Sequence, residues 1–267
     1  MSVDLTPRAR AGCKIGPHLA ETHSMAVKKR ARASGLAQKT MTKFLNAAEE
    51  VFGQHGYEGT TIRAIAKRAR VNLGTLQHYW GSKRALFRDL FERRFGPLNA
   101  EHLRRFRDVE ARASGGRRPE VSEVLRALLE PTMLIGAENG SPYGLGTDSP
   151  AGRKRFRALY GRALMDPSPH VVAEMNRIFE ESIELFLALM GRACPDLDIA
   201  ELDWRVNCII GAQVFSQLYG ERVGKFFGKA ADVDESRAVE WMLHFILHGV
   251  NAPPQGSIPR RRSSRSR

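Results

Sequence analysis

Apolar residues recur along this chain at intervals of three and four, the spacing of one face of an amphipathic helix. The clearest case is Lys39–His55, a helix that Gly53 and Gly56 are expected to end. Its apolar face consists of Phe44, Ala47, Ala48, Val51 and Phe52. Strand-like alternation of apolar and polar residues is absent, so the pattern predicts an all-α fold.

Two short helices are predicted next, the first beginning at Thr60 or Thr61 and the second covering Asn72–Trp80. A fourth begins after Ser82 and is expected to break at Gly96-Pro97. The remaining predicted helices span about 98–112, 120–137, 152–165, 169–192, 199–226 and 235–250. Glycine and proline mark 114–119 and 138–150 as loops.

The two ends of the chain carry no apolar periodicity. We expect residues 1–38 and 251–267 to be disordered basic tails, flanking domains at 39–95 and 96–250. Met25 precedes a basic run typical of the start of a DNA-binding protein, which suggests that translation begins there. The experiment that tests this is the intact mass of the native protein.

The net charge of +13 is unevenly distributed. The segment 39–95 carries +6 and each tail +5, whereas 96–250 carries −3. A basic module beside a mildly acidic one favours a polyanion-binding head on a body with another role. Charge that serves only solubility is the alternative.

Several classes of protein find no support in the sequence. No apolar run reaches the roughly 18–20 residues of a membrane span, and no secretion signal is apparent. Three cysteines without CxxC spacing, Cys13, Cys194 and Cys208, indicate the reducing cytoplasm. No catalytic motif, cofactor site or metal site is predicted. His244 and His248 have metal-ligand spacing, but only Glu240 is near as a third ligand, so packing is the favoured interpretation.

The segment Thr60–Leu86 has the pattern of a helix-turn-helix. Ile62, Ile65, Ala66 and Ala69 form the buried stripe of its first short helix. Arg70-Val71 makes the turn, and Asn72 caps the second helix. That second helix lacks a continuous apolar stripe and so has polar and aromatic groups free for a DNA groove.

This segment resembles the DNA-binding domain of the TetR family of repressors. The matching stretches are AAxxVFGxxGYxGTT at 47–61, IAKRAxV at 65–71 and GTLxHYxGSKxALF at 74–87. The resemblance extends over Thr42–Leu86 and covers about a fifth of the chain by motif. The resemblance implies an N-terminal three-helix DNA-binding head, followed by a larger helical domain for ligand binding and dimerisation.

Four positions depart from the family pattern. Ala64 replaces an acidic residue, so Thr61 is expected to cap its helix alone, at a cost of about 0.5–1 kcal/mol. Arg70 replaces the turn glycine, so either its backbone is left-handed, at a cost of about 1 kcal/mol, or the turn differs slightly from that of the family. Trp80 replaces Phe and is expected to fill the core of the head, whereas Gln77 replaces Tyr and is expected to change operator preference.

The chemistry of the second helix suggests how it contacts DNA. Gln77 can pair with adenine, and Leu73 can pack on a thymine methyl group. Phosphate contacts are expected from side chains around these two. For Tyr79, packing against the neighbouring helix is an equal alternative. The predicted DNA-binding residues are Thr61, Asn72, Leu73, Thr75, Gln77, His78, Tyr79 and Lys83.

In this family the body holds an inducer and pairs with a second subunit. The last two predicted helices suit pairing into a four-helix bundle, although an intrachain core is the alternative. The predicted dimer residues are Trp204, Cys208, Ala212, Phe215, Tyr219, Leu243, Ile246 and Val250. The predicted pocket residues are Met133, Phe156, Tyr160, Met175, Phe179 and Ile183, each of which could instead be plain core. The run 153–157 could meet an anionic ligand or form a solvated turn.

These observations predict a non-enzymatic cytoplasmic regulator that is free of membranes. Its expected partners are double-stranded operator DNA, a second copy of itself and an unknown small, apolar effector that releases a palindromic operator. A transcriptional activator or a less specific DNA binder would use the same head. A helical enzyme or adaptor is a more distant alternative.

Overall fold

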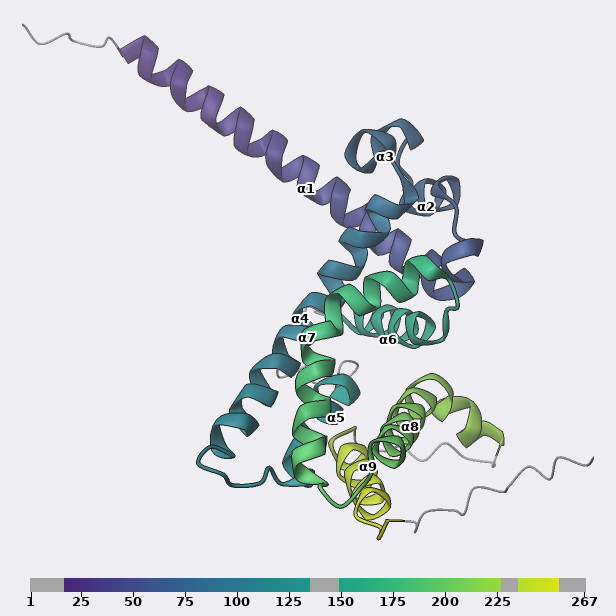
Figure 1. The fold of residues 1–267 in the computed structure, drawn as a ribbon. Coiled ribbons are helices and arrows are strands. Elements are labelled where there is room, and N and C mark those ends of the chain that lie inside the picture. Colours follow the sequence, from purple (N-terminus) through teal and green to yellow (C-terminus); the bar gives the residue numbers. More distant parts are fainter. Residues whose placement is uncertain (1–16, 135–148, 227–234, 255–267) are drawn as a thin grey trace, which may run out of the picture. The chain divides into compact units, whose positions relative to one another are not determined.

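A computed structural model describes residues 17–134, 149–226 and 235–254 (Figure 1). All regular elements in these ranges are helices, which confirms the all-α prediction. The helices are α1 Pro17–Gly59, α2 Ile62–Ala69, α3 Leu73–Trp80, α4 Lys83–Arg112, α5 Val121–Met133, α6 Pro150–Met165, α7 Pro169–Ala193, α8 Ile199–Phe226 and α9 Glu235–Val250.

The first helix is longer than predicted. It begins at Pro17, so the prediction of disorder through residue 38 is wrong for residues 17–38. Residues 17–38 have no apolar face, but they are rich in Ala, Leu, Lys and Arg, whose intrinsic helix propensity is high. The chain divides into two compact units, Met1–Lys43 and Phe44–Arg267, and α1 begins in the first and ends in the second. At its far end, Gly56 leaves helical geometry with φ 70°, where the sequence predicts the end of the helix.

The predicted break at Gly96-Pro97 is wrong, because α4 runs unbroken across it. Proline removes one backbone hydrogen bond from a helix interior. Here the helix has a continuous buried face on both sides of Pro97, including Phe91, Phe95, Leu98 and Phe106. The burial of that face offsets the lost bond, and α4 therefore crosses the predicted domain boundary after residue 95.

The core around α1–α4 is rich in aromatic side chains. Trp80 is 8% exposed and meets the ring of Phe44 edge to face at 5.7 Å, so it fills the core of the head as predicted. Its indole Nε1 donates to Asp89 Oδ2 at 2.8 Å. Phe52 packs on Phe87 at 4.8 Å between ring centroids. These contacts hold α3 against α1 and α4, and α1 against α4.

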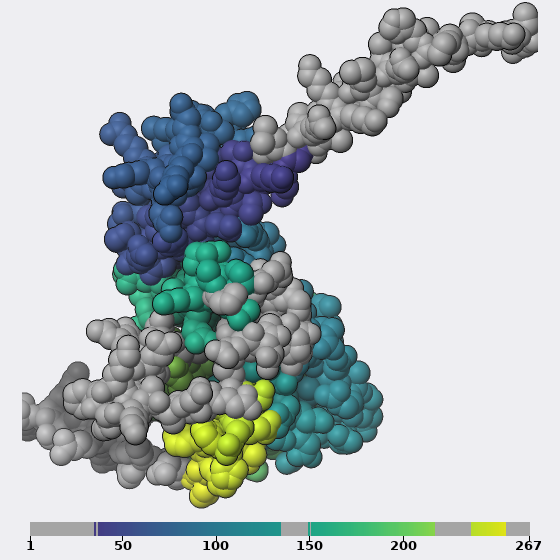
Figure 2. All heavy atoms as spheres, turned by 180° about the vertical axis from the view of Figure 1, so that it is seen from behind, coloured from purple at the N-terminus to yellow at the C-terminus, as the bar shows by residue number. Residues whose placement is uncertain are grey.

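The second core lies around α5, which packs against α4, α7 and α9. Its buried side chains include Phe106, Leu125, Leu129, Phe186 and Leu189. In Figure 2 the yellow surface of α9 adjoins the teal surface of α4 and α5. One face of α9 therefore packs on this core. Its exposed apolar residues lie elsewhere on the helix.

Candidate nucleic-acid interface and ligand cavity

The turn between α2 and α3 depends on one residue in an uncommon conformation. Arg70 has φ 55° and ψ 43°, the left-handed region that disfavours a side chain. Its N–H donates to the carbonyl of Lys67 at 3.2 Å, and the N–H of Val71 donates to that of Ala66 at 3.1 Å. Of the two alternatives for this turn, a left-handed Arg70 is therefore the one present.

Two of the predicted DNA-binding residues cap helices. Thr61 Oγ1 accepts from the N–H of Ala64 at 3.1 Å, and the first turn of α2 carries no acidic residue, so Thr61 caps alone as predicted. Asn72 Oδ1 accepts from the N–H of Gly74 at 2.8 Å. Both caps are exposed at the start of their helices, where phosphates bind well because the backbone N–H groups point outward.

Helix α3 has one buried side and one side open to solvent. Leu76 and Trp80 point into the core, whereas Gln77 and His78 are exposed and Leu73 is 39% exposed. The Gln77 amide donates to the carbonyl of Gly81 at 2.7 Å, which steadies it on the open side. The open side thus carries polar and apolar groups suited to base edges.

Two further predicted contacts are partly engaged within the protein. Tyr79 is half-buried, with its ring 5.8 Å from that of Trp80 and 5.6 Å from that of His78. Thr75 is half-buried as well. Packing is therefore part of the role of Tyr79, in line with the alternative considered for it.

Lys83, the first residue of α4, is held by Tyr57. Its ammonium donates to the Tyr57 carbonyl at 2.8 Å and lies 4.0 Å from the centroid of the Tyr57 ring. An ammonium has three donors, so Lys83 can keep this bond and still bind a phosphate.

The structure adds basic side chains that the motif did not single out. Arg63 and Lys67 on α2 and Arg70 in the turn are exposed. All three come shortly before α3 in the chain. Their signal in the sequence is the +6 charge of residues 39–95. Glu50 neutralises Arg68 at 2.6 Å, so that cation is less available.

A cavity of about 350 Å³ lies within the helical body. We call it the effector cavity after the effector that the sequence predicts, and it is lined mainly by apolar side chains of α4, α6, α7 and α8. Four predicted pocket residues line it, Tyr160, Met175, Phe179 and Ile183. Burial raises the pKa of the Tyr160 hydroxyl, which is therefore protonated at neutral pH.

The other two predicted pocket residues are elsewhere, and the prediction for them is wrong. Phe156 is fully buried against the ring of Phe95 at 5.7 Å, and Met133 packs on the core around α5. Apolar spacing on a helix cannot distinguish a cavity wall from core, because both faces look alike in the sequence.

Three buried polar residues of the effector cavity were not predicted from the sequence: His102, Ser182 and Gln213. His102 is 4% exposed, and its Nε2 donates to the carbonyl of Leu128 at 3.2 Å. Burial lowers its pKa to about 4, so the ring is neutral at pH 7. Gln213 is 1% exposed and lines the same cavity from α8. The signal in the sequence that could have identified them is a polar residue on an otherwise apolar face of a helix.

The predicted dimer residues divide into two groups. On α8, Trp204 is 71% exposed and Phe215 is 55% exposed, Cys208 is exposed and Ala212 is half-buried. The side chain of Tyr219 is outside the part of the chain whose side chains the structure describes. Burial contradicts the predicted positions on α9, because Leu243, Ile246 and Val250 are between 4% and 6% exposed and belong to the core around α5.

The exposed apolar residues of α9 are others. Trp241 is 54% exposed and Phe245 is 71% exposed, and the sequence analysis singled out neither. Helix α9 is apolar on two faces. The residues predicted for the dimer interface lie on its inner face, which packs on the core around α5. The intrachain core, weighed as the alternative, holds for this helix.

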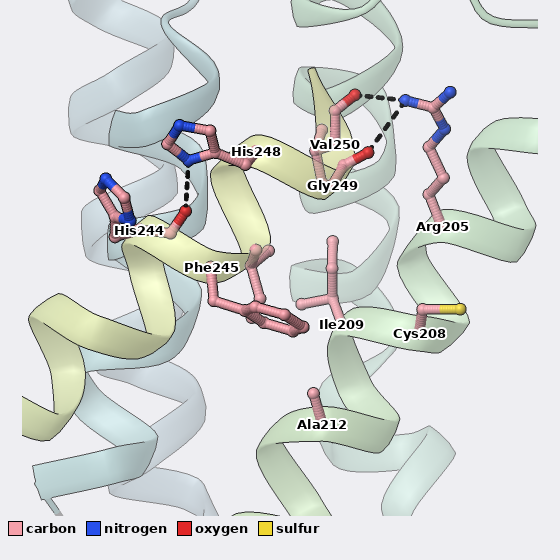
Figure 3. A pocket seen from close by; sticks show the side chains of 10 residues that line it. Arg205, Cys208, Ile209, Ala212, His244, Phe245, His248, Gly249 and Val250 are labelled. Atoms are coloured by element: carbon pink, nitrogen blue, oxygen red, sulfur yellow. Dashed lines mark hydrogen bonds between the residues drawn. The ribbon is translucent and has the colours of Figure 1, made fainter. Parts of the chain in front are cut away.

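A groove of about 640 Å³ runs between α8 and α9 (Figure 3). At one end Arg205 donates to the carbonyls of Gly249 at 3.2 Å and Val250 at 2.5 Å, which caps α9. On the α9 side, His248 Nδ1 donates to the carbonyl of His244 at 2.8 Å.

No metal site forms around these histidines in the part of the chain that the structure describes. The nearest acid in the sequence, Glu240, is engaged by Arg126, whose Nη2 lies 2.9 Å from Glu240 Oε2. Among the described residues no helix is long and apolar enough to cross a membrane.

Two family models match this chain. The model of the tetR family of bacterial regulatory proteins matches residues 44–90. The model of a tetracyclin repressor-like C-terminal domain matches residues 142–249. The chain belongs to the TetR family. This family consists of regulatory proteins, which confirms the prediction that the chain is not an enzyme.

Curated TetR-type relatives match the chain to different extents. The transcriptional regulator UidR of Escherichia coli K12 is 44% identical over 50 residues, 19% of this chain. That match spans 26% of UidR, about a quarter of its length. The repressor KstR of Mycolicibacterium smegmatis is 26% identical over 207 residues, 71% of this chain and 97% of KstR.

A solved structure shares the fold. That of the ketosteroid transcriptional regulator KstR2 of Mycobacterium tuberculosis has a TM-score of 0.50 at 17% identity. The comparison covers 78% of this chain and 93% of that protein. The shared fold is that of TetR proteins, with a helix-turn-helix followed by a helical body.

Proposed function

We propose that this TetR-family chain is a transcriptional repressor that binds a palindromic operator as a homodimer. A small, mainly apolar effector in the effector cavity releases it from DNA. The observation that carries the proposal is the open side of α3, where Leu73, Gln77 and His78 are exposed beside basic residues. The proposed division of the chain into a DNA-binding head and an effector-binding body is the division predicted from the sequence.

On DNA, α3 enters the major groove with its open side toward the bases. Gln77 exchanges its bond to Gly81 for adenine, and Leu73 packs on a thymine methyl group. The remaining predicted residues hold phosphates at the edges of the groove. They are Thr61, Asn72, Thr75, His78, Tyr79 and Lys83.

The homodimer forms through the exposed apolar side chains of α8 and α9. Trp204, Phe215, Trp241 and Phe245 are each more than half exposed, and such exposure is costly for a monomer. Cys208 and Ala212 line the groove between the two helices, where their small side chains allow another helix to approach closely. A two-fold interface of this kind presents two heads to a palindrome.

Release is explained by contacts that join the effector cavity to the head. Tyr160 and Met175, on α6 and α7, line the cavity. At the turn between these two helices, Asp166 Oδ2 accepts from the N–H of Tyr57 at 3.0 Å, and Ser168 Oγ donates to Glu58 Oε1 at 3.1 Å. An effector that separates α6 from α7 moves these contacts, and with them the residue that holds Lys83.

The test is selection of duplexes from a random library by the full-length chain, followed by sequencing. The proposal predicts an inverted repeat whose half-sites are about one helical turn apart, bound by two chains. Enrichment of no sequence over the starting library would indicate a less specific DNA binder and contradict the proposal. A single unpaired half-site bound by one chain would contradict the dimer.

A further inference from the structure

The effector cavity contains a hydrogen-bond donor without an acceptor. Gln213 is 1% exposed, and its Nε2 has no hydrogen-bond partner among the described residues. Burying an amide N–H without a partner costs about as much as losing a hydrogen bond to it. Because Gln213 lines the cavity, an oxygen of a bound molecule could recover that bond.

His102 is another buried polar residue of this cavity, and its ring is neutral and held in one orientation. The His102 ring donates from Nε2 to the carbonyl of Leu128 at 3.2 Å. A carbonyl only accepts, so Nε2 carries the proton and Nδ1 remains a bare acceptor. The ring lies between Phe106 and Phe179, at 5.9 and 6.2 Å between centroids, in apolar surroundings.

No lysine or arginine occurs among the described lining residues, His102 is neutral, and the one charged residue is Asp203, which is exposed. The basic run considered for an anionic ligand does not line the cavity. Within that run, Arg155 faces Glu49, with its Nε 3.9 Å from Glu49 Oε2. A carboxylate in the cavity would lose its hydration without gaining a partner of opposite charge.

We propose that the effector cavity binds a small uncharged molecule, mainly apolar, whose carbonyl or hydroxyl oxygen accepts a hydrogen bond from Gln213. The cavity volume of about 350 Å³ is near the lower end of the usual range for ligand pockets, which favours a compact ligand. The inference rests on the proposed function, because it names the class of effector for that site.

The experiment titrates the full-length chain with three probes of equal carbon number, using calorimetry. The probes are 2-nonanone, 1-nonene and nonanoate, which differ in having a neutral oxygen, no oxygen or a charge. We expect one 2-nonanone per chain, bound roughly tenfold or more tighter than either of the others. Binding of nonanoate at least as tight as that of the ketone, or no binding of the ketone, overturns the proposal.

Two variants test whether Gln213 is the residue that binds the oxygen of 2-nonanone. Gln213→Leu removes the donor at similar volume, so the affinity for 2-nonanone falls to that for 1-nonene while the urea midpoint stays or rises. Asn207→Leu is the matched control, because it makes the same kind of change on α8 at an exposed residue that does not line the cavity. It keeps the ketone preference. A ketone preference that survives in Gln213→Leu contradicts the proposal.

Failure of this inference and failure of the proposed function give different results. Binding of the same proteins to selected duplexes is measured by fluorescence anisotropy. A chain that prefers the ketone but binds no duplex contradicts the repressor and leaves the ligand class standing. A chain that binds its duplex but shows no ketone preference contradicts the ligand class alone.

Discussion

Arg94 of α4 donates from Nη2 to Glu49 Oε2 of α1 at 2.6 Å, and both side chains are at most 3% exposed. This pair lies beside the aromatic core of the head, with the Phe156 ring of α6 5.6 Å from the Arg94 guanidinium carbon. It therefore ties together helices that belong to the head and the body. Two buried charges of this kind are far costlier to separate than to remove together.

Glu49→Leu is expected to lower the free energy of unfolding by about 3–5 kcal/mol, because it leaves the Arg94 charge buried without its carboxylate. The double variant Glu49→Leu/Arg94→Met is expected to recover most of this loss. Urea unfolding followed by circular dichroism measures both. A double variant no more stable than the single one would mean that the pair does not act as a unit.

Arg70→Gly is expected to stabilise the chain by about 1 kcal/mol, because glycine adopts the left-handed φ of 55° without the steric cost of a side chain. Arg70→Ala serves as the control, since it removes the charge and keeps the cost. Thermal unfolding at one protein concentration compares the two. An equal gain in both variants would assign the effect to charge rather than to backbone conformation.

Stability is expected to fall on acidification because of His102. Its pKa is about 4 in the folded chain and near 6.5 when unfolded, so between these values the unfolded state binds the extra proton. The contribution is fully present above pH 6.5 and is lost as the pH falls toward 4, by about 3 kcal/mol in total. His102→Gln keeps a donor for the Leu128 carbonyl and does not titrate. Its unfolding free energy should lose correspondingly less over this range, and an identical slope in both proteins would contradict the assignment.

Phe245→Glu is expected to shift the chain from dimer toward monomer, because it places a charge at the 71% exposed apolar position of α9. Val172→Glu, at a 47% exposed position of α7, is the matched control and should leave the dimer intact. Sedimentation velocity over a concentration series gives the association state. A dimer in both variants would place the interface elsewhere.

The head was largely predictable from the sequence because its motif combines local signals. Gly74–Phe87 sets a helix, a turn and the next helix within a short stretch, and Asn72 and Thr61 cap as their residue types predict. The left-handed Arg70 was one of two alternatives that the glycine of the family at this position implied. Such features depend on neighbours in the chain, so the sequence contains them.

The body was less predictable because its features depend on distant segments. Helix α9 is apolar on two faces, and only packing against α5 shows that Ile246 lies inside and Phe245 outside. Pro97 would break an isolated helix, yet α4 continues because its buried face is long. Gln213 is an ordinary polar residue in the sequence, and its buried, unpartnered amide is a property of the cavity.

The measurement that tests the central claim most directly compares Gln77→Ala and Lys83→Ala on the selected operator. Anisotropy is recorded for the operator and its single-base variants over a series of salt concentrations. Gln77→Ala should lose discrimination at one position of each half-site, by about 1–3 kcal/mol, with the salt dependence unchanged. Lys83→Ala should weaken binding to all duplexes about equally and reduce the salt slope by about 1. The same base profile and salt slope for both variants would contradict reading of the operator by the open side of α3.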